Sequence, residues 1–118
     1  MMAGTQWARL DVGYLSNPKT SRVSVNALLL HLASVLYLAA HGIESGLLPP
    51  EALPYLKVSA RIRGDVGPAV DQLVKQGLWH PNMEGGFLVH DYRQFNGAES
   101  GAVKARERQR RYREGGDA

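Results

Sequence analysis

A helix that runs directly into a β-hairpin is predicted by residues 65–89, DVGPAVDQLVKQGLWHPNMEGGFLV. This succession of elements is the most informative feature of the sequence for the fold. Asp65 is a suitable N-cap, Pro68 falls in the first turn, and Gly77 ends the helix. Two short β-prone runs, residues 78–80 and 87–89, then flank a segment rich in turn formers, which is typical of a hairpin. The helix residues expected to be buried are Val66, Val70, Leu73 and Val74.

A longer helix is expected upstream, over residues 25–41. Ser24 can cap its N-terminus, and Gly42 can take the left-handed conformation that ends a helix. This apolar segment is shorter than the ~20 residues that cross a bilayer, so it predicts a buried core helix. Leu30 and Leu38 lie off the main apolar stripe, which indicates that the helix is covered on more than one side. The main stripe consists of Val25, Leu28, Leu29, Leu32, Leu36 and Ala39.

The remaining segments are shorter. Residues 46–48 predict a small strand, and Pro49-Pro50-Glu51 opens a short helix that extends to about residue 56. Residues 57–64 fit either a further helical turn or an irregular connection. At the N-terminus, alternation over residues 6–12 predicts a strand, and residues 16–19 predict a turn.

This order of elements predicts an α+β fold with the plan of a winged helix-turn-helix. A short helix, a second helix and a β-hairpin follow one another, and in helix-turn-helix proteins the second helix enters the major groove. We expect three helices and a small antiparallel hairpin wing over residues 1–96. Residues 97–118 are expected to form a flexible linker and a basic, arginine-rich tail.

Charge is distributed unevenly along the 118 residues. Residues 1–101 contain 8 Lys/Arg and 8 Asp/Glu, whereas residues 102–118 contain 6 and 3. The difference of the last two, 6 − 3 = +3, is the whole net charge of the chain. Such asymmetry suggests a tail that binds nucleic acid or an acidic partner.

The chain resembles small helix-turn-helix proteins of actinobacterial phages and their hosts, and the N-terminal domains of phage replication initiators. The resemblance covers roughly residues 5 to 113 and implies a winged-helix DNA-binding domain without specifying the DNA sequence. It rests on Trp7-x-x-x-Asp11, Asn17-Pro18-Lys19, Gly46-Leu47-Leu48-Pro49, Gly77-Leu78-Trp79, Gly85-Gly86-Phe87, His90-Asp91-Tyr92 and the arginine-rich C-terminal stretch.

The candidate recognition surface is the exposed side of the helix over residues 65–76, together with the basic residues just before it. Arginine suits guanine and glutamine suits adenine in the major groove. A solvated helix face is the alternative, and it is supported by Asp65 and Asp71, which would repel phosphate. The candidate base-reading residues are Arg61, Arg63, Gln72, Lys75 and Gln76, and the candidate wing contacts are His80 and Asn82.

The tail has the strongest electrostatic signal. Cations on all sides of a helix suit phosphates, and their contribution would depend steeply on salt. The segment could instead bind RNA and fold as it does so, or it could serve only as a solubilising tail. Its basic residues are Lys104, Arg106, Arg108, Arg110, Arg111 and Arg113.

The sequence favours neither a metal site nor an enzyme. It has no cysteine, which rules out disulfides, thiol nucleophiles and Cys-ligated metals. The four histidines lack the spacing of a metal-binding helix, and His31 is expected to be a core or interface histidine. No phosphate-binding loop and no nucleophile elbow is present. We therefore predict no catalytic residue, no metal and no cofactor.

Two functions follow from these patterns. The first is sequence-dependent binding of double-stranded DNA in the bacterial cytoplasm, at the nucleoid, for transcription regulation or DNA replication. The alternative is a winged-helix module that docks a host or phage protein, and the neutral charge of residues 1–101 favours it. Many helix-turn-helix proteins dimerise, so a homodimer stays open; we expect no membrane contact.

Overall fold

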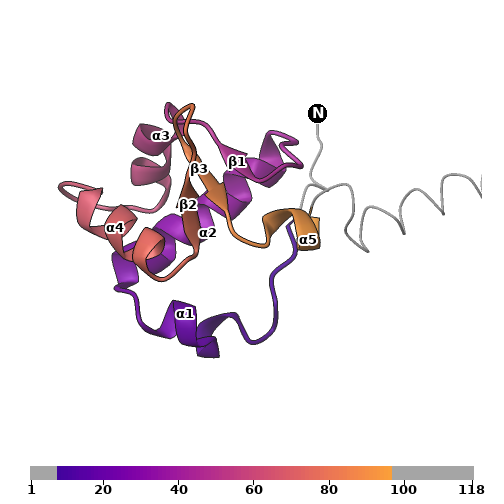
Figure 1. Ribbon diagram of the computed structural model, residues 1–118. Helices are drawn as coiled ribbons and strands as arrows, with labels where there is room; N and C mark the ends of the chain where they lie inside the picture. Colours follow the sequence, from indigo (N-terminus) through magenta and orange to yellow (C-terminus); the bar gives the residue numbers. More distant parts are fainter. Residues whose placement is uncertain (1–7, 97–118) are drawn as a thin grey trace, which may run out of the picture.

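The computed structural model describes residues 8–96. The long helix α2 (Val25–Ala40) crosses behind the sheet, with α3 (Ala52–Ser59) and α4 (Gly67–Lys75) towards one end and α5 (Tyr92–Asn96) at the other (Figure 1). Strands β1 (Leu47–Leu48), β2 (Trp79–Pro81) and β3 (Phe87–Val89) form an antiparallel sheet in the order β1-β3-β2. The α+β class, the small strand at 47–48 and the hairpin are thus confirmed.

Helix α2 has the ends expected from the sequence. The Ser24 hydroxyl accepts a hydrogen bond from the Ala27 amide at 3.2 Å, and Gly42 has a φ of 64°. The amides of Gly42 and Ile43 donate to the carbonyls of Ala39 and Leu38, which is the Schellman pattern. The helix is central, because it contacts α3, α4 and β1.

The main apolar stripe predicted to face the core was assigned to the wrong side of α2. Val25 is 71% exposed and Leu36 is 59% exposed, while Leu30 and Leu38 are fully buried. Apolar residues occur around most of this helix, so spacing alone could not select the inner face. Tertiary packing selects the side on which the small residues Ala27, Ala33 and Ser34 let neighbouring elements approach closely.

Helices α3 and α4 largely follow the expectations. Residues 57–59 complete α3 and residues 60–64 form an irregular connection, so both readings of this segment are partly right. Asp65 was predicted to be the N-cap of α4, but Val66 occupies that position. The Asp65 carboxylate instead accepts from the Gly67 amide at 3.1 Å, which still satisfies one amide at the helix start. Gly77 ends α4 with a φ of 74°.

The N-terminal segment differs from the prediction. Residues 8–12 form no strand, and residues 6–7 lie outside the described part of the chain. The Asn96 side chain satisfies the Arg9 backbone instead of a neighbouring strand, accepting from its amide at 2.6 Å and donating to its carbonyl at 3.1 Å. A 3-10 helix, η1 (Tyr14–Ser16), and the short helix α1 (Pro18–Ser21) stand where a turn was expected.

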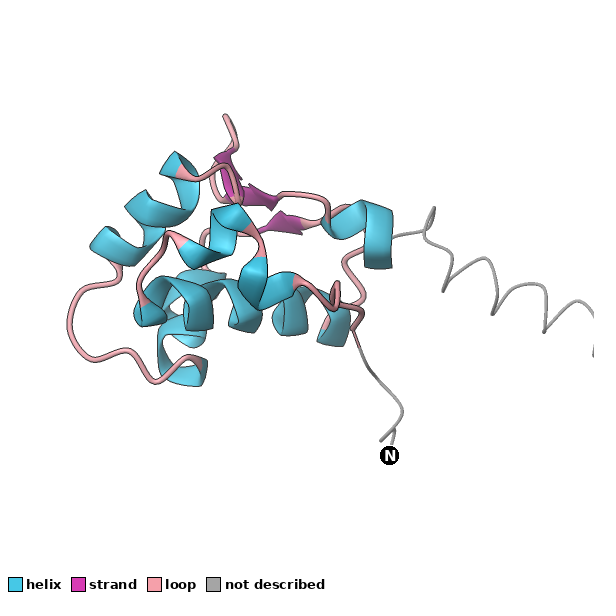
Figure 2. Cartoon of the chain, turned by 90° about the horizontal axis from the view of Figure 1, so that it is seen from below, coloured by secondary structure: helices cyan, strands magenta, loops and turns pink. Residues whose placement is uncertain are grey.

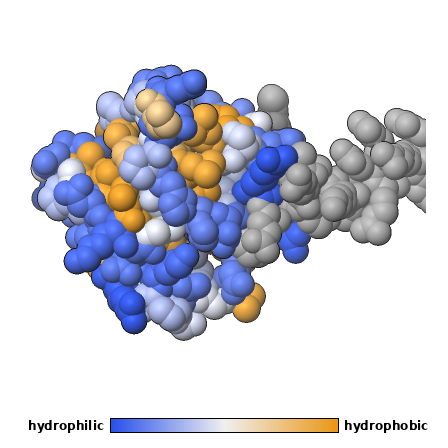
Figure 3. Space-filling model, in the orientation of Figure 1, coloured by the Kyte–Doolittle hydropathy of each residue, from blue (hydrophilic) through white to orange (hydrophobic). Residues whose placement is uncertain are grey.

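The core lies between α2 and the inner face of the sheet. Trp79 is fully buried and its ring packs on Phe87 with centroids 5.0 Å apart. On the outer face, Leu88 lies between its strand partners Leu47 and His80. Figure 2 shows the helices gathered on one side of the strands, and Figure 3 shows apolar surface over the outer face of the sheet.

A close backbone approach holds the hairpin against β1. Gly86 has a φ of 78°, and a Cβ on it would overlap the carbonyl oxygen of Leu48. The hairpin turn is closed by the Asn82 amide, which donates to the Gly86 carbonyl at 3.1 Å. Glycine at this position therefore satisfies both the backbone conformation and the contact between strands.

Replacing Gly86 with alanine should lower the free energy of unfolding by about 2–5 kcal/mol, because strand separation adds to the left-handed strain. Urea unfolding measures the loss. Gly64→Ala is the matched control, since Gly64 has a φ of 84° with no atom within 4 Å of an added Cβ. It should lose only about 1–2 kcal/mol; equal losses in the two variants would contradict the role of the contact.

Candidate nucleic-acid interface and an adjoining cavity

Helix α4 exposes only part of the surface expected to read DNA. Lys75 is exposed in the last turn and Gln76 is half-buried. Gln72 is engaged within the protein, because its side-chain oxygen accepts from the Ser24 amide at 2.6 Å. This bond ties α4 to the start of α2, so base contact by the Gln72 carbonyl would require it to break.

Arg61 and Arg63 are both exposed in the connection that leads into α4. Arg61 has a φ of 59°, at a helix end where glycine is the usual residue. Its amide donates to Val58 and the next amide donates to Lys57, which completes a Schellman motif on α3. An arginine retained in this left-handed position carries a conformational cost that its side chain does not offset by any ion pair in the described residues.

Two further basic residues lie at the opposite end of α4, and sequence analysis did not select them as DNA contacts. The Lys19 Nζ is 3.9 Å from the position that a Cβ would take on Gly77. Arg22 is exposed two residues before Ser24, which is bonded to α4 through Gln72. Hydrophilic side chains cover this part of the molecule in Figure 3. We define the α4 surface as Lys19, Arg22, Arg61, Arg63 and Lys75.

None of these five cations forms an ion pair within residues 8–96. The acidic neighbours Asp65 and Asp71 reduce the positive charge of the surface to 5 − 2 = +3. Asp65 also accepts from the Gly67 amide, whereas Asp71 is exposed on α4. Only the structure shows that Lys19 and Arg22 lie near α4, since they are 45 to 56 residues from this helix in the chain.

The hairpin makes a poorer nucleic-acid surface than expected. The Asn82 side chain donates to the Gly85 carbonyl at 3.2 Å, so it shapes the turn. The turn packs close to Pro50, and its one charged residue is Glu84. His80 is exposed, but its Nε2 lies 2.9 Å from the Nδ1 of His90. The basic tail residues, from Lys104 to Arg113, lie outside the described residues.

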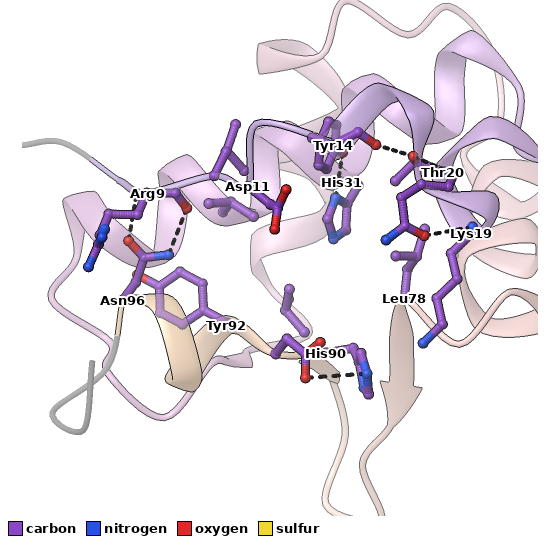
Figure 4. Close-up of a pocket in the computed structure, with 15 residues that line it drawn as sticks. Arg9, Asp11, Tyr14, Lys19, Thr20, His31, Leu78, His90, Tyr92 and Asn96 are labelled. Carbon is purple, nitrogen blue, oxygen red and sulfur yellow. Dashed lines mark hydrogen bonds and ion pairs between the residues drawn. The ribbon is translucent and has the colours of Figure 1, made fainter. Parts of the chain in front are cut away.

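A cavity of about 150 Å³ opens where the N-terminal segment crosses α2 and the edge of the sheet. Figure 4 shows the residues that surround it. The Arg9–Asn96 pair closes one side, and Lys19 and Thr20 stand at the other. Apolar walls come from Leu10, Val35, Leu78, Val89 and Tyr92. Several residues quoted for the family resemblance therefore meet here: Asp11, Asn17, Lys19, Leu78, His90, Asp91 and Tyr92.

Tyr14 and His31 form the innermost polar pair of this cavity. The Tyr14 hydroxyl lies 2.6 Å from the His31 Nδ1, and the two rings stack with an interplanar angle of 12°. Burial lowers the pKa of His31 to about 4 and raises the pKa of Tyr14 to about 12. Both groups are therefore neutral at pH 7. His31 is a buried histidine, as predicted.

His80, His90 and Asp91 form a chain of polar contacts that the hairpin assembles. The His90 Nε2 lies 3.3 Å from the Asp91 carboxylate, and its Nδ1 faces His80. Asp91 has a φ of 60°, the left-handed conformation, directly before α5. Within residues 8–96 no three side chains of the metal-binding types come together to hold an ion.

No family model, no curated protein and no solved structure matches this chain. Among the described residues no helix is both long enough and apolar enough to span a membrane.

Stability should depend on pH through His31. The unfolded chain binds a proton on this residue below about pH 6.5, whereas the folded protein resists protonation until about pH 4. The free energy of unfolding should therefore fall as pH drops from 6.5 to 4, by about 3 kcal/mol from this residue. Urea unfolding at pH 7, 5.5 and 4 should show a smaller decline in His31→Phe; parallel declines would contradict this assignment.

Proposed function

We propose that the chain binds double-stranded DNA through the α4 surface. The observation that carries the proposal is the set of five cations around one short helix with no ion pair in the described residues. The succession α3, α4, β2 and β3 supports it, because a helix pair followed by a hairpin is the plan of winged helix-turn-helix domains.

The dimensions of α4 suit a major groove. An α-helix with its side chains is about 10–12 Å across, which the ~12 Å width of that groove admits, and the nine residues of α4 are about 13 Å long. Arg61 and Arg63 lie before its N-terminus, and Lys19 and Arg22 lie near its C-terminus. In this pose the two groups of cations contact phosphates on opposite walls, while Lys75 and Asp71 face base edges. An aspartate there can accept from the cytosine amino group.

The hairpin takes a minor part in this pose. Its turn carries Glu84 and is folded towards Pro50, so it offers phosphate no cation. The tail residues Lys104 to Arg113 would add affinity that does not depend on sequence. We favour transcription regulation over DNA replication as the use of this binding, and the bacterial cytoplasm as its place.

Replacing Arg61 with glycine should separate binding from folding. Glycine relieves the left-handed strain, so the free energy of unfolding should rise by about 1 kcal/mol. Loss of one phosphate contact should weaken DNA binding and reduce the slope of log K against log salt by about 1. Fluorescence anisotropy of the full chain with a labelled 20-base-pair duplex, at several salt concentrations, measures both effects.

Arg9→Ala is the matched control for this experiment. It removes one exposed cation beside α5, at the opposite end of the domain from α4. The salt slope should be unchanged in this variant. Equal weakening by both substitutions would mean that net charge or the tail governs binding, and would contradict a specific role for the α4 surface.

A second candidate function is protein binding through the outer side of α2. A groove of about 390 Å³ lies between α2 and α3, and no Asp, Glu, Lys or Arg lines it. Val25, Leu29, Leu32 and Leu36 are spaced by four, three and four residues, which places them along one side of the helix. On α3, Tyr55 and Val58 are 59% and 77% exposed. These exposed side chains favour an apolar helix as the partner, and a second α2 is one such helix.

Self-association through this face predicts a concentration-dependent dimer. Leu36→Gln should shift the chain to a monomer, because it places an amide within the apolar stripe. Leu36 is 59% exposed, so the substitution should change stability by less than about 1 kcal/mol. Light scattering after gel filtration, at 10 and 200 μM, reports the mass. A wild-type monomer at both concentrations would contradict a homodimer.

A further inference from the structure

We infer that the cavity beneath the N-terminal segment is a binding site for a small uncharged aromatic molecule that bears a hydrogen-bond acceptor. The residues that define this chemistry are Tyr14, His31, the apolar walls and the four charged groups at the rim. The inference does not depend on DNA binding.

The length of the hydrogen bond between Tyr14 and His31 indicates which group donates. Its length of 2.6 Å lies in the range of O–H donors and below the range of N–H···O bonds. We therefore assign the Tyr14 hydroxyl as the donor and the His31 Nδ1 as the acceptor. In that arrangement the neutral imidazole carries its proton on Nε2, which makes that nitrogen a donor.

The Nε2 of His31 has no hydrogen-bond partner among the described residues. The His31 side chain belongs to a residue that is only 6% exposed, and its Nε2 makes no hydrogen bond within the described residues. In Figure 4 the His31 ring extends from α2 into the space bounded by Asp11, Leu78 and His90. A buried donor left unsatisfied is destabilising, so a ligand that supplies an acceptor at this point would remove a cost of the free protein.

The size and the apolar walls of the cavity suit a small aromatic ring. A cavity of about 150 Å³ with apolar walls is large enough to hold a benzene ring. Leu78, Val89 and Val35 are among its lining residues, which suits a flat apolar body. An aromatic ring with one acceptor substituent would place the ring on these walls and the acceptor at His31.

The charged side chains at the rim of the cavity balance one another. Arg9 and Lys19 at the rim are balanced by Asp11 and Asp91, and the inner residues Tyr14 and His31 are neutral. A carboxylate ligand would gain no net attraction from this balanced rim and would meet only neutral groups at depth. An uncharged ligand avoids the loss of hydration that a buried carboxylate would suffer there.

The test is a titration of the full chain, labelled with ¹⁵N and ¹³C, with three probes of similar ring size. Acetophenone has the ring and an uncharged acceptor, toluene lacks the acceptor, and benzoate carries a charge. We expect acetophenone to shift the signals of Tyr14, His31, Leu78 and Val89 and to bind at least about fivefold more tightly than toluene and benzoate. The His31 Nε2 proton should move towards the chemical shift of a hydrogen-bonded group.

The matched variant is His31→Phe, which removes the donor and keeps a ring of similar size. It should bind acetophenone and toluene equally, with toluene affinity unchanged. Should the variant fail to fold, the three-probe comparison in the wild-type chain decides alone. Equal binding of acetophenone and toluene, tighter binding of benzoate, or no shift at the cavity residues up to 5 mM would each overturn the inference.

Discussion

The packing of the inner side of α2 is the constraint on which the rest of this structure depends. Leu30 and Leu38 are fully buried there, and the helix touches α3, α4 and β1. Small side chains at 27, 33 and 34 set how closely those neighbours approach. Once this side is chosen, the outer stripe is left on the surface, and His31 is brought under the N-terminal segment. The apolar groove and the cavity are therefore both consequences of one packing choice.

Helix ends orient the surface that we propose for DNA. Schellman motifs close α2, α3 and α4, with Gly42, Arg61 and Gly77 in the left-handed conformation. Glycine takes this conformation without strain, whereas an arginine does not. The motif at Arg61 turns the chain into the connection before α4, and the motif at Gly77 directs it into β2. Helix-end bonds thus direct the segment that carries Arg61 and Arg63, whereas the long-range bond between Ser24 and Gln72 brings the segment of Arg22 to α4.

The N-terminal segment joins the two surfaces. Lys19 borders the cavity and also lies beside Gly77 at the end of α4. Asn96 fastens the segment to α5 through the backbone of Arg9, and Thr20 holds its turn by hydrogen bonds to the carbonyls of Tyr14 and Asn17. A molecule bound beside His31 would contact the same segment that carries Lys19.

Helix ends and the hairpin turn depend on local chemistry, so they could be predicted from the sequence. Ser24 and Gly42 fixed the ends of α2, Gly77 fixed the C-terminal end of α4, and the turn formers at 82–86 fixed the hairpin. The buried side of α2 and the conformation of residues 8–12 depend on long-range packing. Such packing selects between structures that the sequence pattern allows equally. It chose the buried side of an all-round apolar helix, and it replaced the strand predicted at 6–12, over residues 8–12, by a segment bonded to Asn96. It also brought Lys19 to α4 and Tyr14 to His31, contacts that spacing along the chain does not encode.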